Sequence, residues 1–134
     1  MKNGAPIRWG WLKIMYFYTL FGAGGLGFGM LFFPGAVRSV FGFPVQDPIV
    51  FKLYGSFLLA SGLIAILALR SPLKFVPLLF LQLIYKPIWL ATAAIPLFLK
   101  GQFPFYVVLI SVVFVTYIIG NLIAIPFHSL FSKA

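Results

Sequence analysis

The sequence predicts an all-α integral membrane protein, with one transmembrane domain (residues 1–134) that forms a four-helix bundle. Hydrophobic residues make up 63% of the chain and charged residues only 8%, whereas an average soluble domain is roughly 45–50% apolar and about 25% charged. The apolar residues also form four long runs. Each run has about 20 residues, the length that a helix needs to cross the hydrocarbon core of a bilayer. A soluble fold of this size could not cover so much apolar surface.

The four runs give the expected spans in order, and proline or a charge marks each gap. Pro34 follows the first span, Pro48 begins the second and Pro104 opens the fourth. Proline is accepted in the first turn of a helix and ends a helix elsewhere. Short gaps join neighbouring spans, so we expect an up-down arrangement. The expected spans are residues 14–33, 49–69, 75–99 and 105–125.

The longest gap, residues 34–47, reads PGAVRSVFGFPVQD. Its apolar side chains predict an amphipathic segment that lies in the membrane interface. We expect Gly42 and Pro44 to break any helix in this segment.

Basic residues predict the orientation of the bundle. The chain has 10 Lys and Arg against one acidic residue, and a formal net charge of +9. No nucleic-acid-binding motif accompanies this charge, and most basic residues lie near span ends, where they anchor helices and contact anionic headgroups. With four spans, both termini share one side, which receives six basic residues against three on the other. We therefore expect both termini in the cytoplasm and the protein in a bacterial plasma (inner) membrane. The six are Lys2, Arg8, Lys13, Arg70, Lys74 and Lys133, and the three are Arg38, Lys52 and Lys100.

Lys86 is the basic residue that this pattern does not explain, because it falls near the middle of the third span. A cation there costs about 2.5–3.5 kcal/mol on insertion scales, and such residues usually face the bundle interior and mark a site. Gln82, Tyr85 and Trp89 recur with Lys86 at helical spacing and share its face. Pro87 removes a backbone hydrogen bond beside it. The sequence thus predicts a ligand or partner pocket around this face.

The charge of Lys86 needs a partner, and Asp47 is the only acidic residue in the chain. A snorkelling lysine side chain could approach Asp47 at the outer start of the second span, so an ion pair is one alternative. The others are a neutral lysine, a ligand or lipid anion, and a carboxylate from a partner subunit. A purely structural lysine would be capped by carbonyl groups and Trp89, or would snorkel to the surface.

Glycines in the first two spans predict close helix packing. Gly22, Gly25 and Gly29 lie in the run GAGGLGFG of the first span, and Gly55 and Gly62 lie in the second. Small residues let two membrane helices approach closely, so we expect these glycines to pack against each other. A flat ligand on the bare backbone, or a homodimer, would be an alternative use of the same run.

The fourth span carries Tyr117 and Asn121 one helical turn apart. Such residues commonly form hydrogen bonds between membrane helices. Asn121 could instead line a polar pocket with Gln82 and Lys86.

Residues for catalysis are scarce. The chain has one acid, no cysteine and one histidine, His128, which follows the fourth span. These residues supply no carboxylate pair, no catalytic triad and no set of metal ligands. We expect no enzymatic activity, no metal and no cofactor.

The second-span stretch DPIVFKLYGSFLLASGLIAILALRSP resembles the small four-helix DoxX-like membrane proteins, which share the length and the four-span layout. That resemblance implies a link to membrane redox partners or an accessory role in a larger complex. Four-span proteins of the EXPERA type, which look like sterol binders or isomerases, use intramembrane carboxylates that this chain lacks.

Three functions follow from these observations. The first is a non-enzymatic accessory or structural subunit, in a homo-oligomer or a larger membrane complex. The second is a binder or carrier of a small hydrophobic or anionic ligand, such as a lipid, quinone or sterol-like molecule. The third is an oligomeric channel or transporter.

Overall fold

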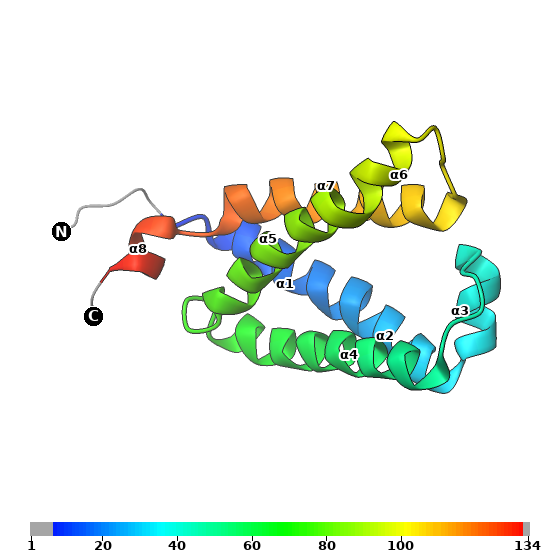
Figure 1. Cartoon of the computed structure of the whole chain (residues 1–134). Helices are drawn as coiled ribbons and strands as arrows, with labels where there is room; N and C mark the ends of the chain where they lie inside the picture. The colour runs from blue at the N-terminus through cyan, green and yellow to red at the C-terminus, as the bar shows by residue number, and fades with distance from the viewer. Residues whose placement is uncertain (1–6, 133–134) are drawn as a thin grey trace.

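The computed structural model describes residues 7–132, and every regular element in this part of the chain is helical. Four helices are long and apolar enough to cross a membrane, which confirms the predicted fold class (Figure 1). The protein is therefore a small polytopic integral membrane protein. The spans are Trp9–Phe32, Pro48–Arg70, Val76–Leu99 and Phe105–Ala124.

Two of the spans contain a widened, π-helical turn. The first span consists of α1 (Trp9–Tyr18), the π turn η1 (Thr19–Gly24) and α2 (Gly25–Phe32). The third consists of α5 (Val76–Trp89), the π turn η2 (Leu90–Ala94) and α6 (Ile95–Leu99). The remaining helices are α3 (Pro34–Phe41), α4 (Pro48–Arg70), α7 (Phe105–Ala124) and α8 (Phe127–Phe131).

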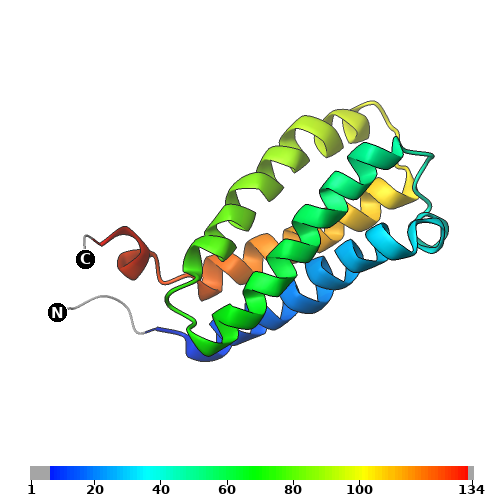
Figure 2. The ribbon, with the colours of Figure 1, turned by 90° about the horizontal axis from the view of Figure 1, so that it is seen from below.

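The spans run alternately up and down (Figures 1 and 2). They form two pairs that diverge toward one end (Figure 1). The first span packs along α4, and α5 packs along α7. The contact between α4 and α5 is smaller. The pairs lie farthest apart at the end that carries α3, opposite the end where the described chain begins and finishes.

The first span begins at Trp9, earlier than the predicted start at residue 14. The prediction followed the apolar run, which Lys13 interrupts. The structure extends the helix because Leu12 and Met15 are buried in the core of the bundle. Burial of one face therefore outweighs the polar residues on the other face of this turn.

Glycines hold the first span against α4, although not all of those expected take part. A Cβ added to Gly62 would lie only 2.5 Å from the Cα of Gly24, and a Cβ added to Gly27 would lie only 2.5 Å from the carbonyl oxygen of Gly55. Both distances are too short for any residue larger than glycine. The expected contacts of Gly55 and Gly62 are thus present. Gly25, by contrast, is exposed and has no neighbour on its side-chain side.

The two other glycines of the run serve different contacts. A Cβ on Gly29 would meet Val37 of α3 at 2.8 Å, and a Cβ on Gly22 would collide with the Tyr117 hydroxyl of α7. The run therefore contacts three separate elements, and it is not a single GxxxG seam.

The gap after the first span contains α3, which ends where Gly42 adopts a left-handed conformation (φ 72°). The Phe43 N–H donates to the Arg38 carbonyl across this cap. The chain then returns to α4 with Phe43 directed between the helix pairs, where its ring contacts those of Phe51 and Tyr106. The helix break expected at Gly42 is present, and the loop that follows it lies at the wide end of the bundle.

Candidate functional site

The interior of the bundle contains several polar side chains beside its hydrophobic core, and many large apolar side chains face outward. An apolar outer surface is expected where the surroundings are lipid. The buried polar residues are Thr19, Ser61, Gln82, Lys86, Ser111 and Asn121.

Lys86 is 2% exposed and is enclosed by aromatic rings. Its Nζ lies 4.2 Å from the ring centres of both Phe114 and Tyr117, and 4.7 Å from that of Tyr85. It donates one hydrogen bond, to the Tyr85 hydroxyl at 3.0 Å. Ring faces attract a cation through their quadrupole. The rings and the hydroxyl are thus the surroundings that the described chain provides for this ammonium group.

Asp47 does not pair with Lys86. Its side chain is exposed at the start of α4, where Oδ1 accepts a hydrogen bond from the Ile49 N–H at 2.8 Å. This is an N-cap, the contact that aspartate makes at the beginning of many helices. The ion pair considered from the sequence is absent from the structure, because Asp47 is exposed at the start of α4 whereas Lys86 is buried within the bundle.

Gln82 lies one turn below Lys86 on α5 and joins α5 to the first span. Its Nε2 donates to the Thr19 hydroxyl at 3.0 Å, and that hydroxyl donates to the Met15 carbonyl at 2.8 Å. The Gln82 Oε1 has no hydrogen-bond partner among the described residues.

Asn121 is fully buried, at 0% exposure, and neither polar atom of its side chain finds a hydrogen-bond partner in residues 7–132. Asn121 follows Tyr117 by one turn on α7, and Gln82 precedes Lys86 by one turn on α5. The structure thus places Asn121 inside the bundle.

Tyr117 links α7 to the π turn of the first span. Its hydroxyl donates to the Tyr18 carbonyl at 2.8 Å, and its ring stacks on the Tyr18 ring with centres 3.8 Å apart. Gly22 leaves room for the hydroxyl. A side chain that inserts at the helix backbone is a recognised cause of a local change in helix geometry. This contact explains why the π turn begins directly after Tyr18.

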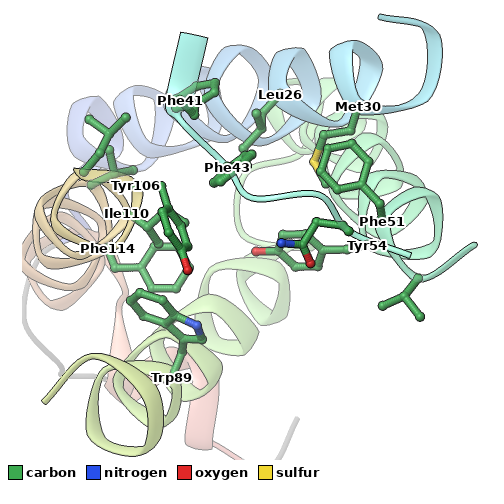
Figure 3. Close-up of a pocket in the computed structure, with 14 residues that line it drawn as sticks. Leu26, Met30, Phe41, Phe43, Phe51, Tyr54, Trp89, Tyr106, Ile110 and Phe114 are labelled. Carbon is green, nitrogen blue, oxygen red and sulfur yellow. The ribbon is translucent and has the colours of Figure 1, made fainter. Parts of the chain in front are cut away.

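A cavity of about 350 Å³ lies at the wide end of the bundle, between the helix pairs and beneath α3 and its loop. Trp89 and Tyr54 face each other across it (Figure 3). Its wall is mainly apolar and aromatic, with a few hydrogen-bonding groups. The lining residues with such groups are Gln46, Tyr54, Trp89 and Tyr106.

The cavity and the Lys86 cluster share a wall. Phe114 lines the cavity, and its ring also contacts the Lys86 ammonium group. The Trp89 ring stands edge-on to the Phe114 ring, with centres 5.1 Å apart. On the other side, Tyr54 lines the cavity and interacts with Tyr85, the hydrogen-bond partner of Lys86. The ammonium group is therefore one ring away from the cavity.

Of the predicted pocket residues, Trp89 lines the cavity, whereas Lys86 and Tyr85 lie behind its wall and Gln82 and Asn121 lie deeper. Sequence reasoning missed Phe43, Tyr54 and Tyr106. These residues come from three separate elements, and only the fold brings them together. A weak signal for Tyr54 was present, since it is a polar-tipped aromatic residue inside the second span.

No family model, curated protein or solved structure matches this chain. The resemblance to DoxX-like proteins stays a prediction.

Proposed function

We propose that this membrane protein binds a small hydrophobic molecule in the cavity at the wide end of the bundle. The observation that carries the proposal is the cavity itself, about 350 Å³ in volume and lined by aromatic residues from both helix pairs. Ligand sites are commonly clefts of roughly 300–1,000 Å³, mainly apolar, with a few polar groups that orient the ligand. The space between helices of a bundle is a frequent position for them.

The polar groups of the wall favour a ligand that accepts hydrogen bonds. The Trp89 indole N–H can only donate, and the hydroxyl groups of Tyr54 and Tyr106 can donate. None of the lining residues carries a carboxylate. A carbonyl or other oxygen on an otherwise apolar molecule would therefore be recognised by this wall. Such molecules include quinones, ketones and lipid-like esters.

Binding can be measured through Trp89, because the chain has only three tryptophans and the other two, Trp9 and Trp11, lie at the opposite end. The double variant Trp9→Phe/Trp11→Phe leaves Trp89 as the only indole. In nanodiscs of phosphatidylcholine, the methyl ester of anthracenecarboxylic acid should quench Trp89 fluorescence in a saturable manner.

Filling the cavity should abolish this binding. Ile110 lies on the cavity wall. We expect Ile110→Phe to weaken binding of the ester by about tenfold or more, equivalent to about 1.4 kcal/mol of binding free energy. The matched control is Ile119→Phe on the same helix, where the side chain is 54% exposed on the outer surface. Unsaturable quenching, or equal weakening by both variants, would overturn the proposal and leave the accessory-subunit role in its place.

The orientation can be tested because the chain lacks cysteine. We propose that the end with α8 faces the cytoplasm, since it carries more basic residues. A cysteine at exposed Gln102 should then react with a membrane-impermeant maleimide in intact cells. A cysteine at exposed Ser132, at the other end, should react only after permeabilisation. The reverse pattern would show the opposite orientation.

A further inference from the structure

Lys86 is a buried basic residue, and the chain places no acidic side chain against it. The only acidic side chain of the protein, Asp47, caps α4 and faces away from the interior. An ammonium group has three N–H donors, and Lys86 uses one of them, toward Tyr85. Removing an ion from water costs several kcal/mol unless a countercharge and hydrogen bonds compensate it. The cluster is therefore electrostatically incomplete.

The position of this charge relates it to the cavity. The Phe114 ring lines the cavity, and the Lys86 Nζ lies 4.2 Å from the centre of this ring. Lysine carries its charge on a flexible four-carbon stem. A rotation of the Phe114 side chain, together with a small shift of that stem, would bring the ammonium group to the cavity wall. A second cation beside a charged Lys86 would be repelled by the ammonium group.

We infer that the natural ligand is an amphipathic organic anion, with its apolar body in the cavity and a carboxylate or phosphate oxygen bound to Lys86. This inference rests on the proposed function and specifies its ligand class. In a low-dielectric interior the attraction between two opposite charges is several times stronger than in water. Close pairs of buried opposite charges at interfaces can be strongly coupled. An anion would thus supply the charge that the helices lack.

A pair of probes with the same apolar body separates the two proposals. Anthracenecarboxylate and its methyl ester are titrated into the Trp89-only protein in zwitterionic nanodiscs at neutral pH. We expect the carboxylate to bind at least tenfold more tightly than the ester. If neither probe binds saturably, the proposed function fails. If the ester binds and the carboxylate binds no more tightly, the cavity is a ligand site and the role of Lys86 is wrong.

The variant Lys86→Met tests the residue directly. We expect it to bind the two probes with affinities within about twofold of each other, while ester affinity remains near that of the parent protein. Ester binding thereby shows that the variant is folded. The matched control is Lys52→Met, which removes an exposed lysine from α4 at the same end of the bundle. A preference for the carboxylate that persists in Lys86→Met, or disappears in Lys52→Met, would overturn the inference.

A competition experiment with the carboxylate probe then identifies the source of the anionic group. Octanoate supplies a carboxylate on a single chain, and phosphatidylglycerol, added to the nanodisc, supplies a phosphate headgroup. Displacement of the carboxylate probe by octanoate supports a free organic acid as ligand. Displacement by phosphatidylglycerol supports a membrane lipid.

Discussion

Gly27→Ala should destabilise the bundle more than any other single added methyl group in the first span. The new Cβ would collide with the Leu59 amide nitrogen and would lie 2.5 Å from the Gly55 carbonyl oxygen. Both atoms belong to the backbone of α4, so no side chain can rotate away. Overpacking a well-packed contact costs roughly 1–3 kcal/mol, and we expect a value near the upper end because two helices must separate. Thermal unfolding in detergent measures the effect.

Gly25→Ala is the matched control two residues away. The Gly25 position is exposed, and an added Cβ meets nothing within 4 Å. Alanine is also a better helix former than glycine by about 1 kcal/mol. The midpoint of unfolding should therefore stay the same or rise. Equal losses in Gly25→Ala and Gly27→Ala would contradict the helix contact described for Gly27 and Gly55.

Lys86→Met should make the protein more stable. The change removes an uncompensated cation and leaves a flexible, polarisable chain of similar length among three aromatic rings, where a thioether packs well. The lost cation–π contacts are worth roughly 0.5–2 kcal/mol each. The desolvation cost of the ion is larger, and replacing buried ionic groups with apolar ones of similar volume often stabilises by about 1–4 kcal/mol. We expect a gain within that range in the same unfolding assay.

The exposed lysine again provides the comparison, since Lys52→Met removes a charge without changing the interior. Its effect on stability should stay within about 0.5 kcal/mol, as for most surface substitutions. A lower midpoint for Lys86→Met than for Lys52→Met would mean that the ammonium group stabilises the contact between α5 and α7. The charge would then be fully compensated, and the argument for an anionic ligand would lose its basis.

Hydropathy and proline positions predicted the four spans, because length and apolar content determine whether a helix can cross a bilayer. It was harder to predict which face of the first span packs against α4. The sequence offered several glycine pairs, and Gly25 with Gly29 forms the more familiar GxxxG spacing. The π turn at Thr19–Gly24 shifts the register of the residues that follow it, and Gly24 and Gly27 face α4 instead. No local sequence pattern predicts this π turn, because the Tyr117 hydroxyl that donates a hydrogen bond to the Tyr18 carbonyl comes from another span.

Helical periodicity likewise placed Gln82 and Lys86 on one buried face, because residues three and four apart are neighbours on a helix. It could not predict the cavity. Phe43 lies in a loop, Tyr54 on α4 and Tyr106 at the start of α7. Their proximity depends on how the two helix pairs and the loop after α3 are arranged in space, which no single stretch of the sequence specifies. Sequence reasoning therefore predicted a pocket around Lys86, whereas the structure places the cavity beside that residue, with Trp89 in its wall.

The aromatic enclosure of Lys86 has a consequence for how the protein enters the membrane. Of the three rings around the ammonium group, two belong to α7, which is synthesised after α5. Alone in lipid, α5 would carry its charge at a cost of about 2.5–3.5 kcal/mol. The first span and α4 can associate earlier through their glycines. We then expect the third and fourth spans to leave the insertion machinery together as a helical hairpin. The reason is that the aromatic rings of α7 cover the Lys86 ammonium group of α5 only after α7 has been synthesised.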